Sequence, residues 1–131
     1  MFIRTFAGLL AAVAAVAIMA GFGLFGATPA LADAPDDVSA ANAVVQRAIA
    51  AAQTGDLARA QREYASYENT WFDIEDGVRE QSTSSYRVIE KRMTDVTAAL
   101  ASGDQAKSVA ALQALDVEQQ HFIKGEPAGP L

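Results

Sequence analysis

The side chains with the most potential for chemistry lie between Glu68 and Glu80, a segment that holds the only tryptophan and five acidic residues. In a helix, Glu68, Trp71 and Glu75 share one face, because residues three and four apart stack along the axis. Glu68 and Glu75 are two turns apart, roughly 10.5 Å, so they need a further ligand to hold one ion. Glu90, on the next expected helix, can supply it. Carboxylate oxygens suit hard cations, so this pattern predicts a site for ferric iron, calcium or manganese at Glu68, Glu75 and Glu90.

The same segment also fits a structural interpretation. Glu75 and Arg79 form an i,i+4 pair in the favourable order, and Trp71 has the spacing of a core anchor on an amphipathic helix. If this face binds a partner protein instead of a metal, Trp71 and Tyr67 are the predicted contact residues. The residue pattern leaves the binding and the structural interpretations open.

Other kinds of site find no support in the composition. The chain has no cysteine and a single histidine, His121, which excludes thiol catalysis and the paired Glu-x-x-His motifs of diiron bundles. No glycine-rich phosphate loop is present, so no nucleotide is expected. A haem held by His121 and Met93 has no further support and is not expected. Because no pair of side chains has a recognisable catalytic relation, we expect a protein that is not an enzyme.

The first thirty-two residues have the pattern of a secretory signal peptide. Arg4 precedes an uncharged apolar run at 5–27, Pro29 interrupts that run, and Ala-Leu-Ala at 30–32 provides the small-x-small site that signal peptidases cleave. We therefore expect cleavage after residue 32 and a soluble mature chain in the periplasm or another extracytoplasmic compartment. The run at 5–27 is also long enough to span a bilayer, so an uncleaved membrane anchor is the alternative.

The mature chain is acidic. Loss of Arg4 with the signal peptide leaves nine basic and sixteen acidic residues, a formal charge of −7. Nucleic-acid binding needs a basic surface and is not expected, whereas cations and basic surfaces are suitable partners. Without cysteines, no disulfide can hold the fold, so its stability must come from the core alone.

Helices are the elements that must position these residues. Good helix formers dominate the mature chain, and its apolar residues recur at steps of three and four positions instead of alternating. Asp36 or Asp37 is the expected cap of the first helix, and a serine of the turn at 81–85 caps the third. The four helices are expected at 38–53, 57–80, 85–101 and 105–123.

Two turns of one type organise these helices. Thr54-Gly55-Asp56 and Ser102-Gly103-Asp104 each offer a glycine that can end one helix and an aspartate that can cap the next. They define two helical hairpins, which predicts an all-α, up-down four-helix bundle over residues 33–124. Residues 125–131, rich in glycine and proline, are expected to form a flexible tail.

A family resemblance rests on the acidic segment and the helix that follows it. The run Tyr67-Glu68-x-x-Trp71-x-x-Ile74-Glu75-Asp76-x-Val78-Arg79, followed by Ser82-x-x-x-Tyr86-x-x-Ile89-Glu90, resembles the extracytoplasmic helical region of bacterial iron permeases of the Ftr1 type. The resemblance covers about residues 57–101, roughly half of the mature chain. The matching positions are Glu68, Trp71, Glu75 and Glu90, and metal binding by the three glutamates is a hypothesis that rests on carboxylate chemistry.

The resemblance implies an extracytoplasmic module that serves iron uptake. In that family, Arg-Glu-x-x-Glu motifs in transmembrane helices conduct the iron, and this chain has no such motif. The chain is therefore expected to be an accessory that binds iron weakly through its helix carboxylates or docks on a separate iron permease. The alternative is an extracytoplasmic scaffold that binds a protein partner without any metal.

Overall fold

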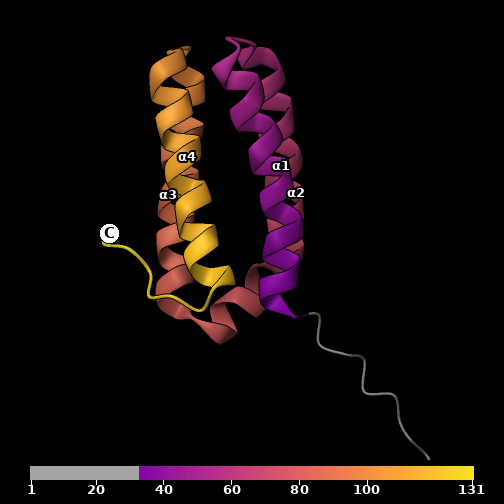
Figure 1. The fold of residues 1–131 in the computed structure, drawn as a ribbon, viewed down its shortest axis with the longest axis vertical. Coiled ribbons are helices and arrows are strands. Elements are labelled where there is room, and N and C mark those ends of the chain that lie inside the picture. Colours follow the sequence, from indigo (N-terminus) through magenta and orange to yellow (C-terminus); the bar gives the residue numbers. More distant parts are fainter. Residues whose placement is uncertain (1–32) are drawn as a thin grey trace, which may run out of the picture.

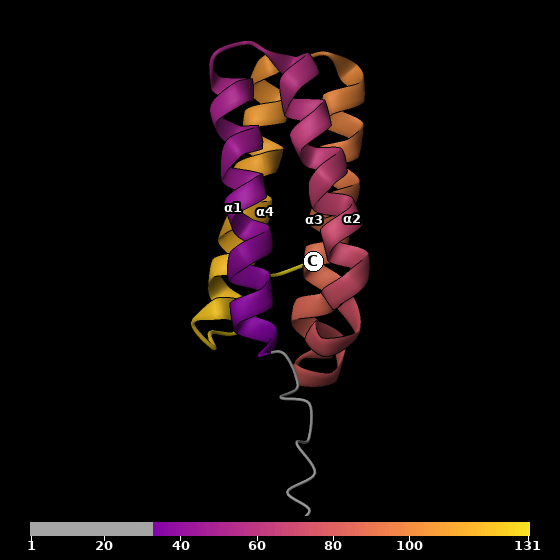
Figure 2. The same ribbon diagram turned by 90° about the vertical axis from the view of Figure 1, so that its right-hand side faces the viewer.

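The computed structural model describes residues 33–131, and the predicted signal peptide lies outside the described residues. Four helices follow one another and run alternately up and down (Figure 1, Figure 2). Each helix packs against two neighbours, so that α1 contacts α2 and α4, and α3 contacts the same two helices. The predicted all-α, up-down four-helix bundle is confirmed. The helices are α1 Ala34–Gln53, α2 Leu57–Gln81, α3 Thr83–Ser102 and α4 Gln105–Ile123.

The two glycine turns form as the sequence predicts. Gly55 and Gly103 have φ angles of 82° and 69°, in the left-handed region that glycine enters without steric cost. Asp56 and Asp104 then cap α2 and α4 by accepting hydrogen bonds from the backbone amide three residues on, at 3.0 and 2.8 Å. Local turn chemistry therefore sets the ends of both hairpins.

The start of α1 differs from the expectation. The helix begins at Ala34, four residues earlier than predicted, because Pro35 in its first turn has a φ angle suited to a helix start. The N-cap is Asp33, whose side chain makes no capping hydrogen bond, and Asp36 and Asp37 lie inside the first turn. Their charges there still favour the helix, because they face the positive end of its dipole.

The connection between α2 and α3 is shorter than predicted. α2 continues through Gly77 to Gln81, and only Ser82 separates it from α3. Ser82 has extended backbone angles, and its hydroxyl accepts a hydrogen bond from the Ser85 amide at 3.2 Å, which caps α3. A single residue of this kind suffices to reverse the chain, so the new helix begins directly after it, at Thr83.

The core lies between the apolar stripes of all four helices. On α1 these positions are mostly alanines and valines, whose small side chains leave room for the large aromatic rings of α2. The largest side chains that are almost completely buried are those of Trp71, Tyr67, Ile89, Leu112, Leu115 and Gln119.

Among the described residues, no helix is both long and apolar enough to cross a membrane.

A network of buried polar side chains joins three of the helices. The Gln119 side chain on α4 donates to the Tyr67 hydroxyl on α2 at 2.7 Å, and its oxygen accepts from the Asn42 amide on α1 at 2.8 Å. Asn42 also donates to Asp116 at 2.8 Å and accepts from Gln120 at 3.1 Å. Tyr67 and Gln119 are completely buried. Because buried hydrogen bonds are directional and costly to break, this network favours one register of α1, α2 and α4.

Replacing Gln119 tests the contribution of the network. Gln119→Leu keeps much of the side-chain volume but leaves the Tyr67 hydroxyl and the Asn42 amide short of a partner. We expect the free energy of unfolding to fall by about 1–3 kcal/mol. The matched control is Gln113→Leu, at an exposed position of the same helix, which should change it by no more than about 0.5 kcal/mol. Urea denaturation followed by Trp71 fluorescence measures both variants, and equal effects would contradict the assignment.

Candidate functional site

Trp71 and Glu90 meet across the seam between α2 and α3. The indole of Trp71 is 1% exposed, and its Nε1–H donates a hydrogen bond to the Glu90 carboxylate, which is half-buried. A charged acceptor makes this bond stronger than one between neutral groups. Two residues of the acidic motif, nineteen positions apart in the chain, are therefore in direct contact.

The Trp71 ring belongs to a row of stacked aromatic side chains. The rings of Tyr64, Tyr67 and Trp71 follow one another along α2, with centroids 5.8 and 6.3 Å apart, and Tyr86 of α3 stacks on Trp71 at 6.3 Å. The Tyr64 hydroxyl donates to the backbone oxygen of Met93 at 2.9 Å, which ties the row to α3 a second time. Rings locked in this way give the side chains beside them fixed positions.

Glu68 lies along the same seam between α2 and α3, which is called the α2–α3 groove below. It is half-buried and borders a small cavity of about 190 Å³. Burial raises the pKa of Tyr64 and of Tyr67 above the usual phenol value, and the charges of Glu68 and Glu90 raise both further. Both carboxylates therefore act on the same two phenols. The other residues around the cavity are Gln61, Tyr64, Thr97, Leu100 and Ala101.

The predicted set of three metal ligands is only partly assembled. Glu68, Glu75 and Glu90 are all half-buried. Glu68 borders the cavity between α2 and α3, Glu90 contacts Trp71, and Glu75 lies one turn beyond Trp71 on α2. Among residues 33–131, no three His, Cys, Asp or Glu side chains converge closely enough to hold a metal ion. A cation at any of these carboxylates would therefore need water or side chains that move to complete its coordination.

The two predicted contact residues are inside the core. Tyr67 is 0% exposed and Trp71 1%, so neither ring offers area to a partner in this conformation. Phe72, the next residue along α2, is 71% exposed. The sequence signal for it was available, because Phe72 falls outside the three-and-four spacing that places Tyr64, Tyr67 and Trp71 in the core.

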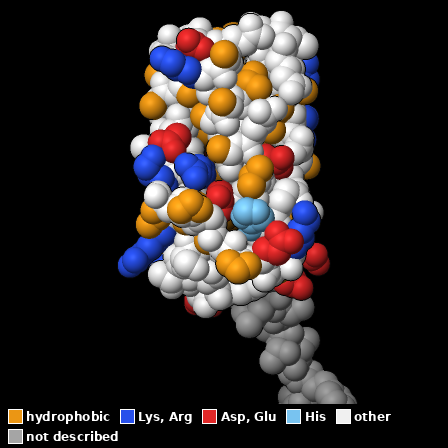
Figure 3. Space-filling model, turned by 60° about the vertical axis from the view of Figure 1, so that its left-hand side comes forward, with side chains coloured by type: hydrophobic (Ala, Val, Ile, Leu, Met, Phe, Trp, Pro, Cys, Tyr) orange, Lys and Arg blue, Asp and Glu red, His pale blue; other side chains and the backbone are white. Residues whose placement is uncertain are grey.

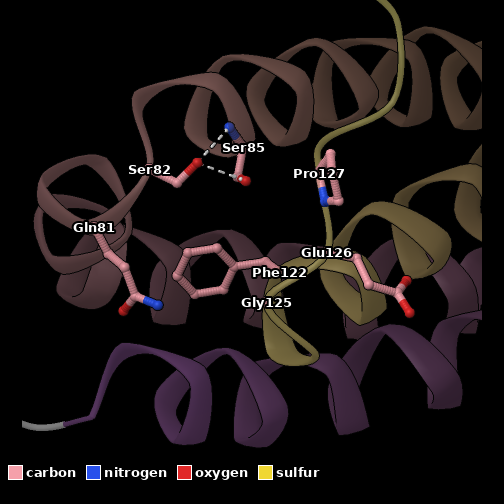
Figure 4. A pocket seen from close by; sticks show the side chains of 7 residues that line it. All are labelled: Gln81, Ser82, Ser85, Phe122, Gly125, Glu126 and Pro127. Atoms are coloured by element: carbon pink, nitrogen blue, oxygen red, sulfur yellow. Dashed lines mark hydrogen bonds between the residues drawn. The ribbon is translucent and has the colours of Figure 1, made fainter.

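A second cavity, which the sequence did not indicate, lies at the end of the bundle. It has a volume of about 310 Å³ and is bounded by the corner between α2 and α3, the end of α4 and the tail (Figure 4). Phe122 provides an apolar wall, while the serine hydroxyls and a glutamate provide polar ones. The lining residues are Gln81, Ser82, Ser85, Phe122, Gly125, Glu126 and Pro127.

The tail after α4 packs back against the bundle. The Gly129 amide donates to the Glu118 carboxylate at 2.9 Å, and Glu118 is only 6% exposed. Around it, His121 Nδ1 lies 3.5 Å from Glu118 Oε2, and His121 Nε2 lies 3.9 Å from Glu126 Oε2. Figure 3 shows a histidine beside acidic side chains at this end of the molecule. The tail is not helical, as the sequence predicts, but its backbone has a defined partner in Glu118.

Comparisons with known protein families, with curated proteins and with solved structures found no match for this chain. Function must therefore be inferred from the residues and the arrangement that the fold gives them. The fold joins Trp71 to Glu90, places Glu68 beside the cavity between the same two helices, leaves Glu75 one turn beyond Trp71, and buries Tyr67 in the core.

Changes at Glu90 test its contact with Trp71. Glu90→Ala removes the acceptor and leaves the indole N–H without a partner, so we expect the free energy of unfolding to fall by about 1–3 kcal/mol. Glu90→Gln keeps an oxygen acceptor and should cost less than Glu90→Ala. Urea denaturation measures the free energy of unfolding of each variant, and the indole proton resonance reports the hydrogen bond. An equal loss of free energy in the two variants would contradict a hydrogen bond between Glu90 and Trp71.

The buried phenols predict a loss of stability in alkali. Tyr64 and Tyr67 stay protonated in the folded chain above pH 10, whereas in the unfolded chain they ionise near their ordinary pKa of about 10. Because the unfolded chain then binds fewer protons, the free energy of unfolding falls as the pH rises above about 10. Urea denaturation at pH about 9 and about 11 measures the fall. Tyr64→Phe should make the fall smaller, and an unchanged fall would contradict the assignment.

Proposed function

We propose that the mature chain is an exported accessory module for iron uptake, which binds iron weakly in the α2–α3 groove and acts beside a membrane iron permease. The observation that carries this proposal is the contact between Trp71 and Glu90. It joins the two halves of the motif that resembles the iron permease family, and Glu68 lies in the same groove. The motif therefore corresponds to one place on the folded molecule.

The chemistry of the groove suits weak binding of a hard cation. One carboxylate oxygen of Glu90 accepts the hydrogen bond from Trp71, and the other accepts none from residues 33–131. Glu68 supplies a second half-buried carboxylate, and Glu75 is the third that can approach by moving its side chain. Oxygen ligands of this kind bind iron, and a site that must complete its coordination with water releases the ion readily. Ready release is what a module that passes iron to a permease requires.

A second function has the support of a different observation. The exposed ring of Phe72 on α2 favours a protein-interaction module that needs no metal. The two functions are compatible, because Phe72 does not line the cavity between α2 and α3.

Iron titration of the mature chain tests the metal-binding form. Trp71 is the only tryptophan, and a paramagnetic ion bound next to it quenches its fluorescence. We expect saturable quenching by ferrous iron or by chelated ferric iron below about 1 mM, the range of weak binding. The Glu68→Gln/Glu90→Gln double variant should weaken the quenching at least about tenfold, because the two carboxylates become neutral.

The matched control is Glu80→Gln, at an exposed position in the last turn of α2. Iron should quench the Trp71 fluorescence of this variant as strongly as that of the unmodified chain. Failure of the unmodified chain to show saturable quenching, or identical curves for the double variant and the control, would overturn the metal-binding form of the proposal.

A further inference from the structure

Phe72 is an exposed aromatic ring in the middle of a long helix. Its side chain is 71% exposed, although a phenylalanine of this kind is normally buried or nearly so. It has no structural task in the bundle, since the neighbouring Trp71 fills the core at this level. Exposed aromatic rings inside a charged surface are characteristic of protein–protein contact sites.

Carboxylates surround Phe72 on the helix surface. Glu68, Glu75 and Asp76 stand one turn from it along the helix, and Asp73 follows it directly in the chain on the solvent-exposed surface. Within the described residues, only Asp76 of these four has a salt-bridge partner, which is Arg79. The surface around the ring is therefore negative and largely uncompensated, and it stands on a chain with an overall acidic charge.

The charge around Phe72 decides between the possible occupants of this face. A second copy would bring the same unpaired carboxylates face to face, where like charges repel. An anionic lipid surface would be repelled in the same way, because lipid binding by a helix face needs basic residues. A protein surface with basic residues around an apolar pocket would gain both from the ring and from the charges.

We propose that Phe72 and the carboxylates of Asp73 and Asp76 form a docking site for a partner protein that presents an apolar pocket bordered by lysine or arginine. The ring enters the pocket and loses its contact with water, and the surrounding charges speed the encounter and fix the orientation. This inference does not depend on iron binding, because neither Phe72 nor the two aspartates line the α2–α3 groove cavity.

Site-specific photo-crosslinking in cells that make this chain tests the proposal. The full exported chain carries p-benzoylphenylalanine in place of Phe72, an exposed position that accommodates the larger ring. We expect a discrete covalent adduct with another protein, whose attached peptide contains lysine or arginine next to the crosslinked residue. Asp73→Lys/Asp76→Lys in the same chain should reduce the yield of the adduct at least about tenfold, as the loss of a complementary charged border does.

The matched control carries the crosslinker at Val117, an exposed apolar position on α4, and should not give this adduct. Several results would overturn the proposal: no protein adduct at position 72, an adduct of two copies of this chain, an adduct with lipid only, the same adduct from position 117, or a yield that charge reversal leaves unchanged. Since the charge-reversed chain keeps Glu68 and Glu90, iron titration of it separates failure of docking from failure of iron binding.

Discussion

The rest of the structure depends on the hydrogen bonds that the side-chain amide of Gln119 makes inside the core. This amide holds Asn42 of α1 and Tyr67 of α2 inside an otherwise apolar core. Apolar stripes alone can slide or rotate against one another at little cost, whereas a buried amide has partners at only one register. With Tyr67 fixed, the rotation of α2 is fixed as well. Trp71 then faces Glu90 across the α3 seam, and Phe72 faces outward.

The α2–α3 groove carries charge, but within the described part of the chain its carboxylates do not form a complete set of metal ligands. Burial and the nearby charges of Glu68 and Glu90 raise the pKa of Tyr64 and Tyr67, so both phenols stay neutral even in alkali. Glu68 and Glu90 are both half-buried, and Glu90 accepts the hydrogen bond of the Trp71 indole. The proposed weak binding of iron requires a groove of this kind, which holds carboxylates without enclosing an ion. The exposed surface of α2 differs from the groove, since an exposed ring among carboxylates, of which only Asp76 is paired within residues 33–131, suits a basic protein surface.

Much of the fold could be predicted from the sequence, because the steps of three and four along each helix and the glycine turns at Gly55 and Gly103 are local signals. The contact between α2 and α3 was partly predictable, since Glu90 follows a buried residue. Gln119 was missed although it stands in an apolar stripe, four residues after Leu115 and three before Phe122. The packing of the tail on Glu118 could not be predicted, because it depends on residues brought together only by the folded bundle.

Iron uptake by living cells tests most directly whether the α2–α3 groove serves iron transport. Radioactive iron uptake is measured at limiting iron in cells that lack this chain and in the same cells supplied with the unmodified chain or with Glu68→Gln/Glu90→Gln at equal exported amounts. The account predicts that loss of the chain lowers uptake, that the unmodified chain restores it, and that the double variant restores little. Unchanged uptake without the chain, or full restoration by the double variant, would contradict it.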